Sequence, residues 1–403
     1  MSTGFLPYGR HWIDEDDIAA VAECLRGDWL TTGPAVPAFE EAFAEAVGAK
    51  YAVVCANGTA ALHLAALAGG VGAGDTCIAP TMSFLASANG MRYAGADIVF
   101  ADADPSSGLI TPESFELAIA SAGRPVKMAV VVHLNGYPVD MAAIARIAAE
   151  NGIMLVEDAC HALGGAYRAE DGTLAKVGAS RHSAMTVFSL HPVKTITMGE
   201  GGVITTEDAA LYERLKRLRN HGMVREADRF VHKEMAFSAN GEPAPWYYEM
   251  QELGFNYRAA DFACVLAHSQ LRKLPLFAER RGRIKAVYDR HFGDIGETVR
   301  PVACVLDAAP VLHLYPLLID FAAFGIDRAK VMAELRARGI GTQVHYIPIH
   351  RQPYYVELNG RADLPGADAY YEQALSLPYY PLMEEADADR VAEAVKQVLG
   401  ING

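Results

Sequence analysis

The sequence lacks long apolar runs, clustered basic residues and a leader segment, and each absence argues against a class of protein. No run of about 18 apolar residues occurs, so we expect no membrane-spanning helix. The formal net charge of −14 argues against nucleic acids and anionic membranes as partners, because both are bound by clustered Lys and Arg. The start, MSTGFLPYGRHWIDEDD, lacks the basic-then-apolar order of a signal peptide. We expect a cytoplasmic protein.

Cysteine is scarce and is not paired along the chain. No CxxC motif occurs, so we expect reduced thiols and neither a disulfide framework nor a metal site. The six cysteines are Cys24, Cys55, Cys77, Cys160, Cys264 and Cys304.

Several common catalytic motifs are also missing. There is no GxxxxGK[ST], HExxH or GxSxG, which removes the usual phosphate-loop, zinc-protease and nucleophile-elbow interpretations. The cluster GGVGAG at 69–74 does not have GxGxxG spacing and ends a helical stretch, so we interpret it as a helix-terminating turn.

The remaining pattern predicts an α/β protein of two domains. Hydrophobic residues make up 51% of 403 residues, enough for a large core. Short β-rich runs alternate with helical stretches, which favours a mainly parallel sheet covered by helices on both faces. A helix is expected at 14–26, and a long one from about Asn256 through Leu271 toward His291. Strands are expected at 51–55, 77–79, 98–101, 128–133, 153–156, 185–190 and 202–205.

The turn Asn57-Gly58-Thr59-Ala60 follows an expected strand and opens an Ala/Leu-rich helix. Free backbone N–H groups and the helix dipole at such a position favour a phosphate, and the Thr59 hydroxyl is a further donor. A simple helix cap is the alternative.

Asp158 lies where the apolar run IMLV ends, at the carboxyl end of a strand, where open α/β sheets bind ligands. A carboxylate there can keep a pyridine nitrogen protonated. The alternative is a cap for the following turn. His161, three residues later, could reach a phenolic oxygen of such a ring or could simply pack.

Lys194 stands between apolar residues and before a glycine-rich turn, on the connection between two expected strands. Partial desolvation lowers the pKa of a lysine and makes its neutral amine available for Schiff-base chemistry. In the segment Thr81-Met82-Ser83-Phe84, the Phe84 ring could stack on a flat cofactor or belong to the core.

The segments that carry these residues resemble those of the DegT/DnrJ/EryC1/StrS sugar aminotransferases across nearly the whole chain. The resemblance rests on NGTAALHLA, EDACHALG, SLHPVKTITMGEGG, LGFNYRAADFACVLAHSQL and VHYIPIH. It implies the aspartate-aminotransferase-like fold (fold type I) of pyridoxal 5′-phosphate (PLP) enzymes, with a large mixed seven-stranded sheet domain and a smaller C-terminal α+β domain. We expect an N-terminal arm and the large domain at 1–260, and a linking helix and the small domain at 261–403. It also implies a homodimer whose active sites are shared between chains.

The resemblance assigns roles residue by residue. Lys194, Asp158 and His161 are the implied catalytic residues, of which Lys194 binds PLP, Asp158 contacts its ring nitrogen and His161 neighbours its ring oxygen. The implied cofactor contacts also include Gly58, Thr59, Ala60, Phe84 and Ser189, with Asn256 from the other subunit. The implied substrate contacts are Tyr8, Asp28, Trp29, Leu30, Thr31, Gln343, His345 and Tyr346.

The beginning, the WYYEMQELGFNYR segment and the YYEQALSLPYYP segment resemble most the family members of pseudaminic-acid biosynthesis. This implies transfer of an amino group from L-glutamate to C4 of a UDP-linked 4-keto-6-deoxy-N-acetylhexosamine. Related sugar dehydratases carry histidine in place of the lysine, so Lys194 favours transamination. The alternatives are another nucleotide-sugar transaminase, acting on a GDP-, dTDP- or UDP-linked keto-sugar, a PLP-dependent dehydratase, or a non-catalytic regulatory homologue.

Overall fold

The computed structural model describes residues 4–169, 172–302 and 307–401. Cys304 lies outside the described residues, and the other five cysteines are free thiols. Within the described ranges, no helix is long and apolar enough to cross a membrane.

The centre of the molecule is a seven-stranded mixed sheet in the order β1-β9-β8-β5-β4-β2-β3. Five strands (β2, β3, β4, β5 and β8) are parallel, whereas β9 is antiparallel to both neighbours, β8 and β1. This confirms the predicted fold class, and every predicted strand is present. The strands are β1 (Tyr51–Cys55), β2 (Thr76–Pro80), β3 (Asp97–Ala101), β4 (Val126–Val132), β5 (Met154–Asp158), β8 (Met185–Ser189) and β9 (Gly202–Thr206).

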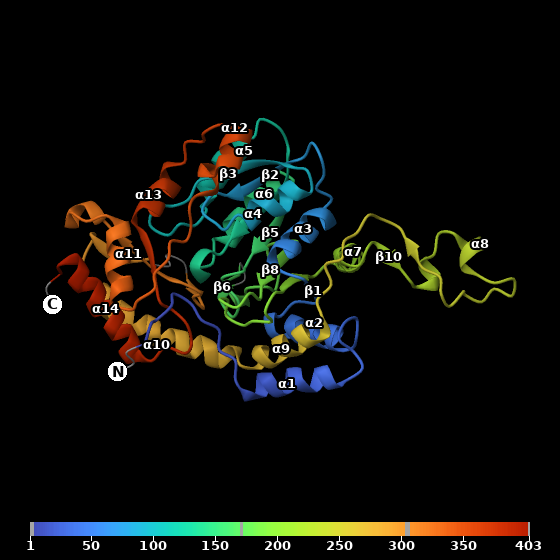
Figure 1. Cartoon of the computed structure of the whole chain (residues 1–403). Coiled ribbons are helices and arrows are strands. Elements are labelled where there is room, and N and C mark those ends of the chain that lie inside the picture. Colours follow the sequence, from blue (N-terminus) through green and yellow to red (C-terminus); the bar gives the residue numbers. More distant parts are fainter. Residues whose placement is uncertain (1–3, 170–171, 303–306, 402–403) are drawn as a thin grey trace.

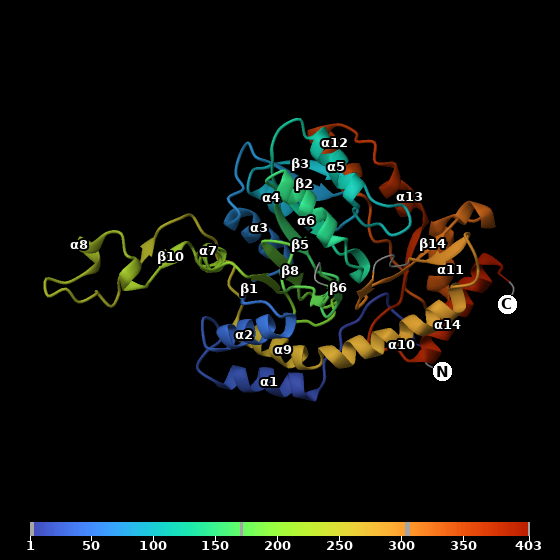
Figure 2. The same ribbon diagram turned by 180° about the vertical axis from the view of Figure 1, so that it is seen from behind.

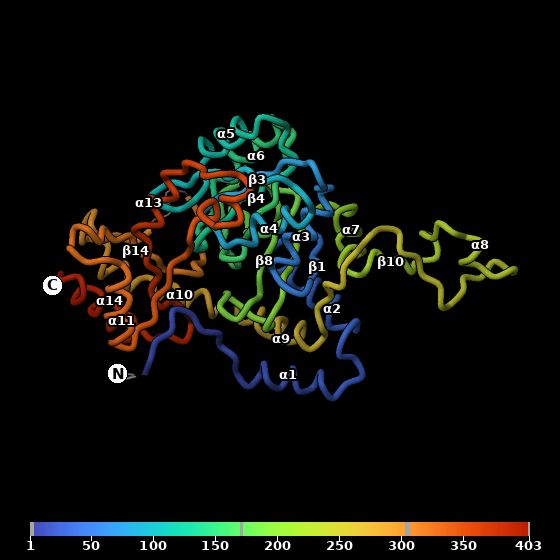
Figure 3. The backbone as a smooth tube through the Cα atoms, turned by 45° about the horizontal axis from the view of Figure 1, so that its top comes forward, coloured from blue at the N-terminus to red at the C-terminus, as the bar shows by residue number. Residues whose placement is uncertain are grey.

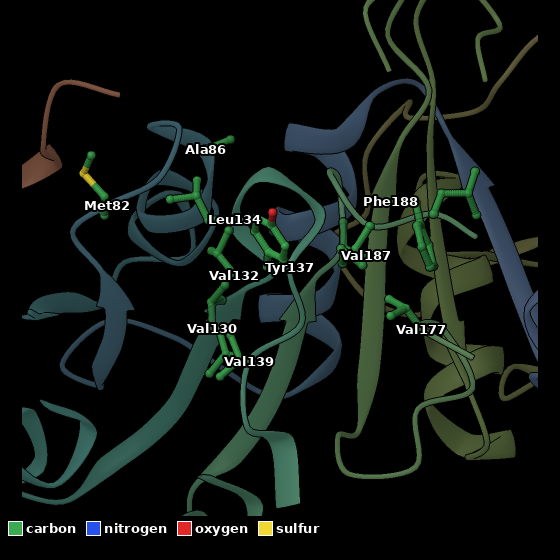
Figure 4. Close-up of a cluster of buried hydrophobic side chains, with 14 of the residues drawn as sticks. Met82, Ala86, Val130, Val132, Leu134, Tyr137, Val139, Val177, Val187 and Phe188 are labelled. Atoms are coloured by element: carbon green, nitrogen blue, oxygen red, sulfur yellow. The ribbon is translucent and has the colours of Figure 1, made fainter. Parts of the chain in front are cut away.

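Apolar side chains cover both faces of this sheet, as expected for parallel strands in an α/β protein. Figure 4 shows Val130 and Val132 of β4 and Val187 and Phe188 of β8 among the buried side chains. The helices along this part of the chain are α3 (Gly58–Ala68), α4 (Ala86–Tyr93), α5 (Pro112–Ser121), α6 (Met141–Glu150) and α7 (Ala209–Arg219).

Two further helices, α1 (Glu15–Arg26) and α2 (Ala35–Val47), each pack against α9 (Asp261–Arg272). Figures 1 and 2 show them together along the lower side of the molecule. The acidic start of α1 is explained by a capping box between Asp14 and Asp17.

The predicted start of the long helix, at about Asn256, is wrong. Asn256 forms an isolated β-bridge with Asn220, and Ala260 is still extended, so α9 begins only at Asp261. After Lys273 the chain continues as α10 (Leu274–Phe292), which packs on α14 (Glu385–Leu399).

The C-terminal part holds a three-stranded antiparallel sheet in the order β12-β14-β15. Its elements are β12 (Val299–Pro301), β14 (Tyr315–Ile319) and β15 (Ala374–Leu377), with α11 (Arg328–Ala337), α12 (Pro353–Asn359) and α13 (Pro365–Gln373). A second small sheet contains β6 (Ala166–Arg168), β7 (Leu174–Lys176) and β13 (Ala308–Ala309).

Residues 221–255, which we call the arm, project far from the rest of the molecule (Figure 3). The arm contains β10 (Met223–Val224), α8 (Lys233–Ala236) and β11 (Glu249–Met250) and has a small core of its own around Val224, Phe230 and Ala236. Large apolar side chains nevertheless remain exposed on it, namely Val231, Met235, Trp246, Tyr248, Met250 and Leu253.

Candidate active site

A cavity of about 660 Å³ lies where the carboxyl ends of β5 and β8 meet segments from both ends of the chain. It is large enough for a cofactor together with a small substrate. The predicted site residues that line it are Tyr8, Gly58, Thr59, Ala60, Phe84, Asp158, His161, Ser189, Lys194, His345 and Tyr346.

Asp158 ends β5 and is buried, with both carboxylate oxygens bonded. The Ser87 hydroxyl of α4 donates to Oδ2 at 2.7 Å, and the Cys160 backbone N–H donates to Oδ1 at 3.1 Å. The Ser87 hydroxyl is itself bonded to that of Ser83 at 2.7 Å. These bonds fix the direction of the carboxylate at the edge of the sheet.

Lys194 lies in the loop between β8 and β9, and this loop is closed at its base. The Leu190 N–H donates to the Gly201 carbonyl at 2.8 Å, and the Met198 N–H donates to the Leu190 carbonyl at 3.0 Å. Burial lowers the pKa of Lys194 below its usual value, although Cys160 and Asp158 oppose this shift. The lowered pKa makes a neutral amine more accessible, as nucleophile and base chemistry require.

The start of α3 lies against the end of β8. A Cβ atom on Gly58 would come within 2.9 Å of the Ser189 Cβ, so only glycine permits this approach. The Asn57 side chain caps the helix by accepting the Ala60 N–H at 2.8 Å. The cap interpretation is therefore correct for Ala60, while the Gly58 and Thr59 N–H groups at the helix start face no intrahelical acceptor.

His161 is bonded at both ring nitrogens. Its Nδ1 accepts the Asn135 backbone N–H at 3.2 Å, and its Nε2 lies 3.0 Å from the Tyr346 hydroxyl. Burial, with smaller effects of Lys194 and His345, holds the pKa of His161 well below its usual range. The ring is therefore neutral, and because Nδ1 accepts, its single proton is on Nε2 and is donated to Tyr346.

The aromatic side chains at the mouth differ in exposure. The Phe84 ring is 55% exposed, and its centroid lies 5.9 Å from that of Tyr346. The ring centroids of Tyr8 and His345 lie 5.4 Å apart, and the Nδ1 of His345 is hydrogen-bonded to the Ser376 hydroxyl at 2.9 Å. The Phe84 face is thus available to a flat ligand, whereas His345 is held in place.

Six predicted residues do not line this chain's cavity. They are Asp28, Trp29, Leu30, Thr31, Asn256 and Gln343, all of them exposed. The first five gather at the base of the arm, because Thr31 bridges to Ala260, the Asp261 N–H donates to the Leu30 carbonyl, and Asn256 bridges to Asn220. Gln343 instead forms a bridge with Ser376.

Sequence reasoning missed several residues that line the cavity or support it. Ser87 holds Asp158 from 71 positions away in the chain. His313 lies beside His161, with ring centroids 4.6 Å apart. Neither belongs to a local motif, so the only available signal was that His313 opens the apolar run HLYPLLI at 313–319, which contains β14. Asn57 and Ser83 had been noted only as parts of their segments. Other missed lining residues are His63, Tyr93, Cys160, His191, Glu200 and Tyr257.

Comparisons with known proteins agree with this geometry over nearly the full chain. The model of the DegT/DnrJ/EryC1/StrS aminotransferase family matches residues 11–396. The spore coat polysaccharide biosynthesis protein SpsC of Bacillus subtilis is 36% identical over 398 residues, 98% of this chain and 97% of SpsC.

Solved structures of sugar aminotransferases have the same fold. PseC of Helicobacter pylori, an aminotransferase involved in the biosynthesis of pseudoaminic acid, matches with a TM-score of 0.87 and 29% identity, covering 98% of this chain and 99% of PseC. The PLP form of Spr1654, a putative sugar aminotransferase of Streptococcus pneumoniae, matches with a TM-score of 0.85 and 25% identity, covering 98% of this chain and 99% of that one.

Proposed function

The chain belongs to the DegT/DnrJ/EryC1/StrS aminotransferase family, and from that premise we propose roles for its cavity residues and a substrate for the enzyme. It is a sugar aminotransferase whose cofactor is PLP. The observation that carries the proposed roles is that Lys194, Asp158 and the start of α3 share one cavity.

The residues present fit PLP. The glycine-dependent approach of Gly58 to Ser189 creates a narrow cradle, where backbone N–H groups, a helix N-terminus and the Ser189 hydroxyl suit a phosphate. Asp158 is an oriented carboxylate for a pyridine nitrogen, and the exposed Phe84 ring offers a face for stacking. His161 lines the same cavity, and we assign it as the neighbour of the ring oxygen.

Bound PLP supplies a carbonyl that takes up an amino group and a ring that delocalises electrons when carbon loses a proton. In our proposal, Lys194 holds the cofactor covalently at rest. Once its amine is free, Lys194 Nζ removes the proton from the α-carbon of the amino donor and later delivers a proton to the sugar carbon. Asp158 keeps a proton on the ring nitrogen, and Ser87 keeps Asp158 in place.

For the substrates, we propose L-glutamate as donor and C4 of a UDP-linked 4-keto-6-deoxy-N-acetylhexosamine as acceptor, in the biosynthesis of pseudaminic acid or a surface glycan. The similarity to PseC and the sequence resemblance support this choice. The similarity to SpsC keeps another surface-polysaccharide sugar as the nearest alternative.

Incubating the purified enzyme with L-glutamate and a panel of UDP-, GDP- and dTDP-linked keto-sugars tests the substrate. We expect 2-oxoglutarate release to depend most strongly on the UDP-linked 4-keto-sugar. A strong preference for another nucleotide or for a 3-keto-sugar contradicts the proposed acceptor. Borohydride treatment followed by peptide mass mapping tests the cofactor role, with a pyridoxyl group expected on Lys194 and on no other lysine.

We also propose a homodimer in which each cavity is completed by the partner. Five predicted contact residues gather at the base of the arm instead of in their own cavity, and the arm exposes six large apolar side chains. Such a surface is typical of a protein interface. In a symmetric dimer, the group around Asn256 and Trp29 of one chain would reach the other chain's cavity.

Mixed dimers test this arrangement. Homodimers of Lys194→Ala and homodimers of Asn256→Ala should both be inactive, because each substitution removes a needed group from both active sites. Co-expression of the two variants creates heterodimers with one site intact, so we expect about a quarter of wild-type activity to return. Activity that stays at the level of the separate variants shows that Asn256 serves its own chain's site.

A further inference from the structure

His313 is a buried imidazole in the cavity wall whose ring lacks hydrogen-bond partners. Its exposed fraction is 4%, and its Nδ1 is fully buried without a partner. Among the cavity-lining residues of the described ranges, it alone has a buried side-chain nitrogen or oxygen in that condition. Buried polar groups without partners are rare in folded proteins and call for an explanation.

The main chain at His313 is nevertheless firmly held. Its N–H donates to the Asn135 carbonyl at 2.9 Å, and its carbonyl accepts from Arg281 Nη1 at 3.1 Å. Asn135 also donates its own N–H to His161, so one residue anchors both imidazoles side by side. The two rings differ in one respect: His161 is bonded at both nitrogens, and His313 is not.

The surroundings of His313 are basic. Arg281 is only 1% exposed and donates to the carbonyls of His313 and Tyr379. In the described part of the chain, no carboxylate lies within ion-pair distance of Arg281, and its Nε is unpaired as well. Burial chiefly, with Lys194 next, holds the pKa of His313 well below its usual range. A buried positive charge without a counter-ion favours an anion nearby.

The cavity needs a group that binds the donor. Arginine is the usual partner of a carboxylate, and none is present among the described lining residues of the cavity's own chain, so any group that this chain itself supplies for the donor is of another type. The cradle at α3 is the proposed phosphate site, so a second anion has to be bound elsewhere. At His313, the unpaired imidazole ring of the cavity wall lies near the buried positive charge of Arg281, which has no counter-ion.

We propose that His313 binds a carboxylate of the amino donor, with the charge of Arg281 behind it. This inference rests on the proposed function, since it concerns the donor half of the reaction. Because Nδ1 is fully buried, the carboxylate accepts a hydrogen bond from the other ring nitrogen, Nε2, which is not fully buried and has no partner either. His313 is thus a residue of donor recognition, whereas the sugar is recognised by other groups.

The two half-reactions separate these roles. Holoenzymes with His313→Asn or His313→Gln are mixed with L-glutamate, and conversion of the chromophore is followed by absorbance. We expect the glutamate concentration that gives half of the maximal rate to rise about 10- to 100-fold. This is the usual effect of losing one hydrogen bond to a charged group. The reaction of the aminated enzyme with the keto-sugar should change less than about twofold. The proposal is overturned if the half-maximal concentrations of L-glutamate and of the keto-sugar rise by the same factor, or if only that of the keto-sugar rises.

Binding of glutarate, a dicarboxylate without an amino group, gives a readout independent of turnover. Calorimetry should show glutarate binding to wild-type holoenzyme and to the control His11→Asn, an exposed site, and a matching loss in the His313 variants. Equal binding by all four proteins overturns the inference. Because this measurement needs no amine transfer, it stands apart from a failure of the proposed donor.

A crystal structure of wild-type holoenzyme with glutarate serves as a check that does not depend on the variants folding. A carboxylate oxygen within hydrogen-bond distance of the His313 ring supports the proposal. Both carboxylates bound away from His313 overturn it.

Discussion

The two sides of the cavity are built on different chemistry. The sheet side carries the ionisable pair Lys194 and Asp158, each fixed by a closed loop or by paired hydrogen bonds. The C-terminal side carries His313, His345 and Tyr346, and burial keeps both imidazoles neutral. In our proposal, the sheet side moves protons and the C-terminal side recognises substrates.

Removing the amine on the sheet side should have the largest effect. Lys194→Ala is expected to lower kcat by at least about 10²–10⁴-fold, the usual contribution of positioned acid–base catalysis. Single-turnover absorbance measurements with glutamate check this, with Lys330→Ala, an exposed helix position, as control. The melting temperature should stay near that of the wild type, and a variant with near-native turnover refutes the role of Lys194.

On the same side, changes at Asp158 and at Ser87, which orients it, should lower kcat/KM to different degrees. Asp158→Asn keeps the shape but removes the charge, and we expect kcat/KM to fall about 10- to 100-fold. Ser87→Ala removes only one of the bonds that orient Asp158, so a fall of about fivefold is expected. The cofactor absorbance spectrum should shift in Asp158→Asn and hardly change in Ser87→Ala. If Ser87→Ala is the more damaging change, Ser87 does more than orient the carboxylate.

Loss of the Tyr346 hydroxyl on the C-terminal side should have a smaller effect, and one on binding. Tyr346→Phe removes the acceptor of the His161 proton and the hydroxyl at the cavity wall. The KM for the keto-sugar should rise about 2- to 10-fold, the usual effect of one neutral hydrogen bond, with kcat nearly unchanged. A fall in kcat with KM unchanged would contradict the proposal that the C-terminal side serves substrate binding.

The smallest expected effect concerns stability in acid. Burial, aided by Lys194, lowers the pKa of His345 from 6.5 to about 3. Between these values the unfolded chain binds a proton that the folded chain does not, so stability is unaffected above pH 6.5 and decreases as the pH falls toward 3. His345→Asn should weaken this decrease, shifting the acid midpoint downward by about half a pH unit. Urea unfolding at pH 7.5 and pH 5 measures it, with the exposed His11→Asn expected to behave like the wild type.

The sheet side could be predicted from sequence because its residues lie in short local motifs. Asp158 ends an apolar strand, Lys194 follows another, and the α3 turn has cap-forming residues, so each position follows from strand and turn patterns. His313 on the C-terminal side and Ser87 beside Asp158 could not be predicted in the same way, since both are brought in by packing across long sequence separations. His345 and Tyr346 were expected only from the family resemblance. The boundary between two domains at residue 260 stays a prediction, as do the individual site roles.

The antiparallel direction of β9 has one more consequence. Because the chain reverses between β8 and β9, both ends of the Lys194 loop are tied to the same edge of the sheet. The closed loop therefore keeps the Lys194 amine in the cavity, where its effective concentration exceeds that of any free amine in solution. In the proposed role of Lys194, recapture of the cofactor after each turnover is then a first-order event, which favours Lys194 over free amines other than the bound donor.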